Sequence, residues 1–218
     1  MRYYPVFLRI AGARCVVIGG GEVAARKVTS LLAAGARVTV IAPQLTPELA
    51  ERAARGEIAH ATRAYRPGDL DGARLAFAAT DDEALHAALA READAAGVPL
   101  NVVDRPQWCT FIVPSVATRG DLTVAVSSAG GSPALARRVR EDIEQALGPE
   151  YERALDVLVR LRAHLRARPS PERQRILRAL VASDLLDRLR EPDAAAVDRL
   201  LAEHAGQGVS LASLGAEL

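Results

Sequence analysis

The stretch CVVIGGGEVAARKVTSLLAAGARVTVIAP, from Cys15 to Pro43, decides the fold of this chain. A strand-like run over 14–18, apolar from Cys15 onward, is followed by three glycines and by a helical pattern over Glu22–Ala34. A second apolar run then covers 37–42. A strand, a turn, a helix and a second strand in this order form a βαβ unit, whose two strands lie parallel in one sheet.

The three glycines fit a dinucleotide-binding turn. Gly19-Gly20-Gly21-Glu22-Val23-Ala24 matches G-x-G-x-x-G/A directly after one expected strand and directly before a helix. In that context Gly19 permits the tight turn, Gly21 lets the backbone approach a pyrophosphate, and Ala24 lets the helix pack closely on the strand. The helix N-terminus offers unpaired N–H groups and a positive dipole end to the phosphates. The alternative is a glycine turn with a structural role only.

The end of the second expected strand lacks the usual ribose-binding residue. An Asp or Glu is expected about 20 residues past the glycines for NAD, or an Arg for the 2′-phosphate of NADP. The stretch Val40–Gln44 supplies neither. We expect Gln44 to hydrogen-bond a ribose hydroxyl, with backbone amides supplying the remaining contacts. The absence of a basic residue there favours NAD over NADP.

Strand and helix patterns keep alternating up to Asp104. Thr46 is a good N-cap for the helix that begins at Pro47, because its hydroxyl can accept from the first turn. The remaining expected elements are strands over 57–61, 73–79 and 99–103 and helices over 47–55 and 82–96. Strand–helix alternation with short connections predicts an α/β fold, a doubly wound parallel sheet covered on both faces.

The pattern changes after Asp104. Residues 111–128 read as two strands joined at Arg119-Gly120-Asp121, which predicts a hairpin. A glycine-rich loop then leads into a helix with Ser132 at the N-cap and Pro133 at the first position. From Tyr151 onward the pattern is helical, with interruptions at Pro169 and Pro192, and the last residues are expected to be frayed.

Composition narrows the classes of function. The net charge of +1 argues against a nucleic-acid or membrane-surface role. No stretch has the roughly 18 consecutive apolar residues of a membrane span, so we expect a soluble cytoplasmic protein. Two cysteines, Cys15 and Cys109, give neither a disulfide framework nor a four-ligand metal site, and Cys15 is expected in the core. No resident metal is expected, because the four histidines lack ligand spacing: His60, His86, His164 and His204.

Five motifs, the first of which contains the glycine turn, occur in a specific order and together resemble one family. They are GGGEVAARK, AATDD (78–82), NVVD (101–104), FIVPS (111–115) and VAVSSAGGSPALAR (124–137). The chain resembles precorrin-2 dehydrogenase over about residues 1–150, the module found alone or at the N-terminus of siroheme synthase. The resemblance implies NAD-dependent oxidation of precorrin-2 to sirohydrochlorin by a homodimer. It also implies a Rossmann-like NAD-binding domain (1–113), a small α+β dimerisation segment (114–148) and a helical C-terminal domain (149–218).

The resemblance also implies roles for individual residues. Asp104 matches the family's important aspartate and is the candidate base, although it can instead position a pyrrole N–H or merely cap the next turn. Because the substrate bears many carboxylates, we expect arginines near it. The cofactor residues are Gly19, Gly21, Glu22, Val23, Pro43, Gln44 and Thr80, the substrate residues are Ser128, Asn101 and Arg105, and further arginines in this part of the chain are Arg119, Arg137, Arg138 and Arg140.

Three alternatives stay open. A bifunctional enzyme would also insert ferrous iron into sirohydrochlorin at the same site. A non-catalytic regulator would bind NAD or a tetrapyrrole without turnover, and Asp104 beside an intact glycine turn counts against it. A general oxidoreductase acting on a small substrate is disfavoured by the VSSAGGSP block.

Overall fold

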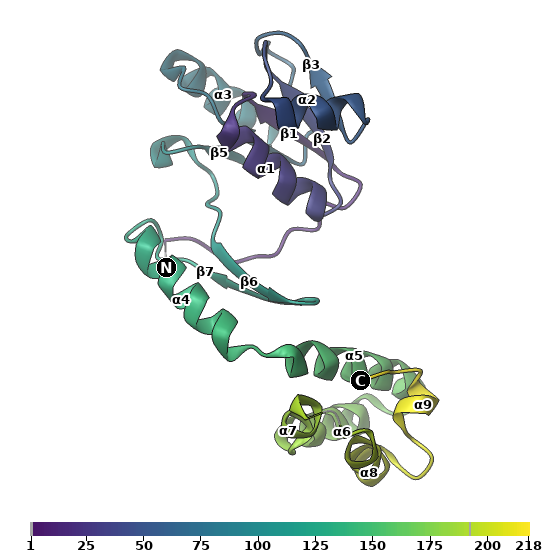
Figure 1. Cartoon of the computed structure of the whole chain (residues 1–218). Coiled ribbons are helices and arrows are strands. Elements are labelled where there is room, and N and C mark those ends of the chain that lie inside the picture. The colour runs from purple at the N-terminus through teal and green to yellow at the C-terminus, as the bar shows by residue number, and fades with distance from the viewer. Residues whose placement is uncertain (1, 192) are drawn as a thin grey trace. The chain divides into compact units, whose positions relative to one another are not determined.

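A computed structural model of the chain describes residues 2–191 and 193–218 and is drawn in Figure 1. The chain divides into two compact units, Met1–Val113 and Pro114–Leu218. The first unit is a parallel sheet with helices. The second begins with a hairpin and continues as helices.

The first unit is a five-stranded, wholly parallel sheet in the order β3-β2-β1-β4-β5. This order is a doubly wound arrangement, since the chain moves outward from β1 in one direction and then, through β4 and β5, in the other. The predicted Rossmann-like α/β fold class is confirmed. The elements are β1 (Arg14–Ile18), α1 (Glu22–Ala33), β2 (Arg37–Ile41), α2 (Pro47–Ala54), β3 (Ile58–Ala61), β4 (Leu75–Ala78), α3 (Glu83–Ala96), β5 (Leu100–Val102) and the 3₁₀ helix η1 (Pro106–Trp108).

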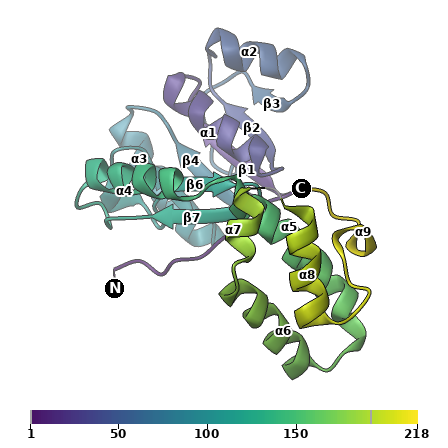
Figure 2. The ribbon, with the colours of Figure 1, turned by 60° about the horizontal axis from the view of Figure 1, so that its bottom comes forward.

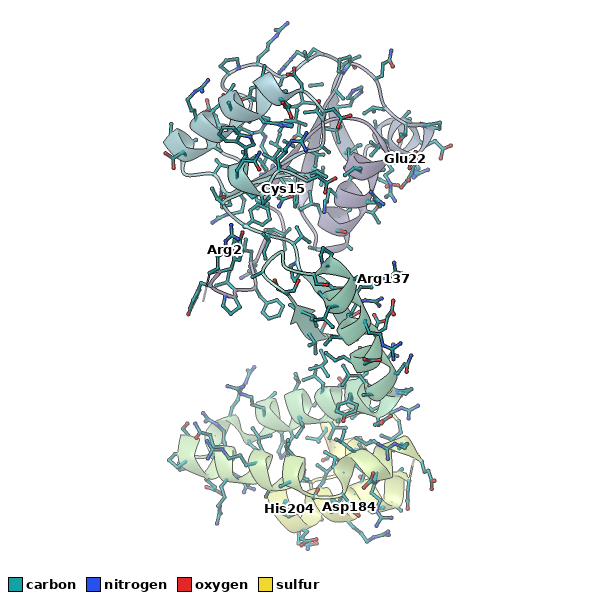
Figure 3. All side chains as sticks on the ribbon, turned by 90° about the vertical axis from the view of Figure 1, so that its left-hand side faces the viewer. Arg2, Cys15, Glu22, Arg137, Asp184 and His204 are labelled. Carbon is teal, nitrogen blue, oxygen red and sulfur yellow. The ribbon has the colours of Figure 1, made fainter. Side chains whose placement is uncertain are left out.

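Both faces of this sheet are covered. Cys15 and Val17 of β1 point to the core beneath α1 and α2, whereas Val16 and Ile18 point to the core beneath α3. The alternation follows from the two-residue period of a strand, and continuous apolar runs are what a strand buried on both faces requires. Figure 3 labels Cys15 inside the unit, where it is fully buried as expected.

Short polar residues begin the helices that the sequence predicts. The Thr46 hydroxyl accepts a hydrogen bond from the N–H of Leu49 (3.4 Å), and the Asp82 carboxylate accepts one from Leu85 (3.1 Å). Each bond satisfies one of the N–H groups left unpaired at a helix start. These caps fix where α2 and α3 leave the carboxyl edge of the sheet.

The second unit begins with the predicted hairpin, in which β6 and β7 pair antiparallel from Ser115 opposite Val126 to Arg119 opposite Leu122. Gly120 makes the turn with φ +52°, a conformation that favours glycine. The elements are β6 (Ser115–Arg119), β7 (Leu122–Val126), α4 (Pro133–Ala146), α5 (Pro149–His164), the 3₁₀ helix η2 (Leu165–Ala167), α6 (Ser170–Ala182), α7 (Leu185–Arg190), α8 (Ala194–Ala205) and α9 (Leu211–Leu214).

The helices from α5 onward pack around one apolar core, and Figure 2 shows α5, α6, α7 and α8 side by side. The predicted break at Pro169 is confirmed between η2 and α6, while Pro192 lies outside the described residues. The expected fraying of the last residues is wrong. Ser210 and Ser213 form a reciprocal capping box on α9, and Leu211 and Ala216 are buried, so caps and apolar contacts hold this segment. Within the described ranges, no helix is long and apolar enough to cross a membrane.

Truncating one buried leucine of this core tests the packing. Leu161 of α5 is fully buried, and Val159 on the same helix is 58% exposed. We expect Leu161→Ala to lower the free energy of unfolding by ~2–5 kcal/mol, because it leaves a cavity. Val159→Ala, the matched control, should change it by less than about 0.5 kcal/mol. Urea unfolding followed by circular dichroism measures both, and equal effects would contradict the packing described here.

Candidate active site

The candidate site lies at the carboxyl edge of the parallel sheet, between β1 and β4. There the loop after β1 leads toward β2 and the loop after β4 leads toward β5, so the two loops diverge. Ligands of open α/β sheets bind in the crevice formed at such a switch point. The glycine turn and the Thr80 loop are therefore brought together by topology, as the sequence pattern predicted for a doubly wound sheet.

The first two glycines of the turn are required by the protein's own backbone. A Cβ on Gly19, whose φ is +115°, would lie 2.1 Å from the carbonyl oxygen of Ala79. A Cβ on Gly20 would lie 1.9 Å from the carbonyl oxygen of Gln44. Any side chain at either position would push one of the neighbouring loops away.

Gly21, unlike Gly19 and Gly20, has open space in front of it, and this space shows that a dinucleotide fits at the turn. Its φ is −86°, which any residue adopts, and a Cβ there would meet nothing within 4 Å. Gly21 is also the N-cap of α1 and brings no side chain to bond the first-turn N–H groups. Open space in front of unpaired N–H groups at a helix N-terminus is the surface that a pyrophosphate occupies.

The start of α1 combines an exposed and a buried side. Glu22 is exposed at the first helical position, and Figure 3 labels it on the outside of the unit. Val23 is half-buried, and Ala24 is fully buried in the core beneath the helix. The small Ala24 side chain thus lets α1 sit close on the sheet, which holds the glycine turn in place.

Pro43 and Gln44 are exposed just past the end of β2. The loop is tied to the glycine turn, because the N–H of Thr46 donates to the Gly20 carbonyl at 2.8 Å. His60 of β3 supports it from the other side, with Nε2 2.9 Å from the carbonyl oxygen of Ala42. The Gln44 side chain therefore lies at the carboxyl edge beside the glycine turn, within the same small region where ribose binding was predicted.

The loop after β4 is held by His86, one of the four histidines that lack metal-ligand spacing in the sequence. His86 is buried, and its Nε2 lies 2.8 Å from the carbonyl oxygen of Thr80. Since a carbonyl only accepts, Nε2 carries the proton, and Nδ1 is buried without a partner among the described residues. The Thr80 hydroxyl accepts from the N–H of Asp82 at 3.4 Å. His86 thus fixes the position of Thr80.

Asp104 follows β5 at the same edge and is exposed, with φ +57° in the left-handed region. Positive φ is rare outside glycine, and Asp and Asn adopt it more readily than most residues. The neighbouring Arg105 side chain pairs with Glu83, with Nη2 3.0 Å from Oε1. Asp104 therefore sits in a turn whose backbone is set by its surroundings, not at a relaxed strand end.

The segment after Asp104 is pinned back onto β5, which determines where Asp104 lies. The Thr110 hydroxyl accepts from the N–H of Leu100 at 2.8 Å, and the Asn101 side-chain N–H₂ donates to the Phe111 carbonyl at 3.0 Å. The Cys109 sulfur accepts from the N–H of Val102 at 3.2 Å. Burial raises the pKa of the Cys109 thiol, which keeps it a packing group and makes it a poor nucleophile.

Ser128 belongs to the second unit, in the loop between β7 and α4. Its hydroxyl accepts from the N–H of Ser132 at 2.9 Å, and its carbonyl accepts from the N–H of Gly131 at 2.9 Å. Ser132 in turn caps α4, as expected, by accepting from Leu135 at 3.2 Å. Ser128 therefore shapes this loop, and its own O–H proton is left to donate elsewhere.

Most of the expected arginine cluster has partners inside the protein. Arg119 donates to the carbonyl oxygens of Leu147 and Glu144 and so caps the end of α4. The arginines of α4 pair along their own helix: Arg137 with Glu141, Arg138 with Asp142, and Arg140 with Glu141 and Glu144. Figure 3 labels Arg137. Spacing of four residues explains these pairs, because such side chains are neighbours on a helix.

Metal ligands were not expected from the sequence. Among residues 2–191 and 193–218, no group of three or more His, Cys, Asp or Glu side chains is placed to hold an ion. In a chelatase the iron is a substrate and the macrocycle supplies four nitrogens, so this finding concerns a resident metal only.

Similar proteins are known for both units. Residues 6–115 match the family described as "Putative NAD(P)-binding", and residues 119–146 match the family of the sirohaem biosynthesis protein central domain. The siroheme synthase of Methylobacillus flagellatus is 46% identical over 175 residues, which are 80% of this chain and 38% of that protein. The siroheme synthase of Stutzerimonas stutzeri is 39% identical over 217 residues, 99% of this chain and 46% of that protein.

The chain thus spans less than half the length of these curated relatives. A solved structure with the same fold is SirC, a precorrin-2 dehydrogenase, with a TM-score of 0.70 and 24% identity, covering 87% of this chain and 96% of that one. These matches confirm the resemblance that the motifs indicated. Since the first family covers half of the chain, residues 6–115 of 218, the chain belongs to the NAD(P)-binding family.

Proposed function

We propose that this chain is an NAD-dependent precorrin-2 dehydrogenase that forms sirohydrochlorin on the route to siroheme. The observation that carries the proposal is the pairing of two features at one sheet edge. Gly21 leaves open space before the N-terminus of α1, and Asp104 brings an exposed carboxylate to the end of β5. A dinucleotide on the first and a reacting macrocycle beside the second fit the relatives named siroheme synthase.

The reaction removes a hydride and a proton from the macrocycle, so the protein's tasks are binding, orientation and proton removal. NAD⁺, when bound, accepts the hydride. The N–H groups at Gly21, Glu22 and Val23 would hold the pyrophosphate, and Gln44 would hydrogen-bond the adenosine ribose. Thr80, fixed by His86, lies at the switch point of the sheet, where it would contact the bound dinucleotide.

Asp104 takes the proton that leaves with the hydride and passes it to water, since its carboxylate is exposed. The turn after β5 holds the backbone of Asp104 at φ +57°. Functional residues are often held in such sparsely populated conformations.

Arg105 is the arginine of the predicted cluster that lies next to Asp104. Its ion pair with Glu83 is solvent-exposed on both sides and therefore weak, so a substrate carboxylate can replace Glu83. The Asn101 N–H₂ donates to the Phe111 carbonyl, so its side-chain oxygen can accept a hydrogen bond from a pyrrole N–H. The Ser128 hydroxyl accepts from Ser132, so its proton can be donated to a substrate carboxylate. We propose all three as substrate-binding residues.

We propose that the enzyme is a cytoplasmic homodimer with three domains, 1–113, 114–148 and 149–218. The helical core contains residues from Ala154 onward only, which supports the last boundary. Exposed apolar side chains on β6 and α4 support the dimer: Val116, Leu135 and Val139. A two-stranded sheet is marginal alone, and a second copy would cover these side chains.

The assay that tests the function is anaerobic. Purified protein is mixed with precorrin-2 and with NAD⁺ or NADP⁺, and the visible spectrum is followed before and after ferrous iron is added. Sirohydrochlorin formation that depends on NAD⁺ supports the proposal, and iron insertion faster than in a protein-free control would add the chelatase activity. No conversion by protein that binds NAD⁺ would overturn the proposal in favour of a binding or regulatory role.

Substitutions at two adjacent glycines should separate cofactor binding from folding. We expect Gly21→Asp to keep the melting temperature, because Asp is a good N-cap and the site has room for it. The new carboxylate would occupy the N–H groups that bind the pyrophosphate, so NAD⁺ binding should be lost. Gly20→Ala should instead lower the melting temperature, because its Cβ meets the Gln44 carbonyl. Calorimetric titration and thermal unfolding test this, and normal NAD⁺ affinity in Gly21→Asp would contradict the assignment.

Replacing the candidate base should remove turnover but not cofactor binding. Asn tolerates positive φ as Asp does, so Asp104→Asn preserves the turn better than Ala would. We expect kcat to fall about 100-fold or more, the usual contribution of a positioned base, with the NAD⁺ dissociation constant unchanged. Stopped-flow absorbance measures the rate. A kcat close to that of the unaltered protein would remove Asp104 from the mechanism.

A further inference from the structure

Of the three buried residues on α3, only His86 is polar; the other two are Leu89 and Ala93. The His86 Nε2–H donates to the Thr80 carbonyl at 2.8 Å, whereas Nδ1 is buried and has no hydrogen-bond partner among the described residues. An unpaired buried acceptor destabilises a fold, and an apolar side chain would fill the same space without that cost. Packing alone therefore does not account for a histidine at this position, and the bond to Thr80 does.

The loop that His86 holds has two bonded carbonyl groups and two N–H groups left over. The ring of His86 bonds the carbonyl of Thr80, and its backbone N–H donates to the carbonyl of Asp82 at 3.2 Å. Within the described ranges, no hydrogen bond uses the N–H of Thr80 or the N–H of Asp81. Successive unpaired N–H groups in a turn attract anions and other acceptor oxygens. The loop is therefore built to donate hydrogen bonds to a ligand.

The direction of the Thr80 carbonyl decides what this loop offers to a dinucleotide. The loop lies against the glycine turn, because a Cβ on Gly19 would lie 2.1 Å from the carbonyl oxygen of Ala79. A dinucleotide bound in front of Gly21 carries acceptor oxygens on its phosphates, its riboses and its carboxamide. A carbonyl turned toward these oxygens would repel them, whereas an N–H group would bind them. Bonding the Thr80 carbonyl to a buried ring removes this repulsion.

We propose that His86 is a positioning residue for the dinucleotide: by holding the Thr80 carbonyl toward the protein interior, it keeps the N–H groups of Thr80 and Asp81 available to acceptor oxygens of bound NAD⁺. His86 acts through the loop, because its own side chain is buried. The inference rests on the proposed function for its cofactor and does not depend on which substrate is oxidised.

Two substitutions at His86 separate the hydrogen bond from the packing. His86→Leu fills the space but removes the donor, so we expect the NAD⁺ dissociation constant to rise about 10-fold or more, as for the loss of a hydrogen bond. His86→Gln keeps an N–H₂ group the same number of bonds from Cβ as Nε2. Its NAD⁺ affinity should be within about threefold of that of the unaltered protein. Calorimetric titration measures both dissociation constants.

Leu89→Ala is the matched control, because Leu89 is fully buried on the same face of α3 and makes no side-chain hydrogen bond to the loop. The cavity should lower the melting temperature of this variant. Its NAD⁺ affinity, measured well below that temperature, should stay within about threefold of the unaltered value. Normal affinity in His86→Leu, or an equal loss of affinity in Leu89→Ala, would reduce His86 to a packing role and overturn the proposal.

The hydrogen bond itself can be observed without the cofactor. In protein labelled with ¹⁵N-histidine, two-dimensional ¹H–¹⁵N spectra distinguish the two neutral tautomers of each ring, and the signals missing from His86→Gln belong to His86. We expect the proton on Nε2, the atom that faces the Thr80 carbonyl. A proton on Nδ1 instead would leave no donor for Thr80 and would overturn the proposal.

Steady-state kinetics separate this inference from the proposed function. His86→Leu should raise KM for NAD⁺ and leave kcat at saturating NAD⁺ close to that of the unaltered protein. If the unaltered protein binds NAD⁺ but does not convert precorrin-2, the proposed function fails, and the dissociation constants still decide the role of His86. If it converts precorrin-2 and His86→Leu binds NAD⁺ normally, only the inference about His86 fails.

Discussion

The structure of the first unit depends on how closely three loops approach one another at the carboxyl edge of the sheet. The backbone after β1 lies against the carbonyl groups of Ala79 and Gln44, so close that no side chain fits at Gly19 or Gly20. This contact forms where the chain reverses its winding direction, and it brings the ends of β1, β2 and β4 together. Gly21, one residue further along, has no such neighbour. The same turn that closes the fold thereby leaves one open surface for a ligand.

The fold was largely predictable because it rests on local patterns. Apolar runs, helical periodicity and caps such as Thr46 and Ser132 act over a few residues, and the elements lie where these signals put them. The C-terminal segment was mispredicted, because a capping box between Ser210 and Ser213 and the burial of Leu211 depend on tertiary packing. The composition of a short segment that mixes glycine, serine and apolar residues does not reveal such packing.

The candidate site was predictable to a smaller extent. Topology placed the glycine turn, Thr80 and Asp104 on one edge, since the carboxyl ends of parallel strands lie together. The hydrogen-bond partners of these side chains could not be predicted. The support of Thr80 by His86 and the pinning of residues 105–111 by Thr110 and Asn101 depend on contacts between residues that no spacing rule connects. The arginines of α4 pair with acids one turn along the same helix, and the prediction of substrate-binding arginines did not consider these partners.

We propose that one edge of the sheet holds the dinucleotide in front of Gly21 and the reacting groups beside Asp104. The decisive experiment is a crystal structure of the chain with NAD⁺ bound. We expect the pyrophosphate on the N–H groups at the start of α1, the adenosine ribose at Gln44 and the nicotinamide on the side of Asp104. NAD⁺ bound away from Gly21, or with its nicotinamide at the Gln44 side, would contradict it.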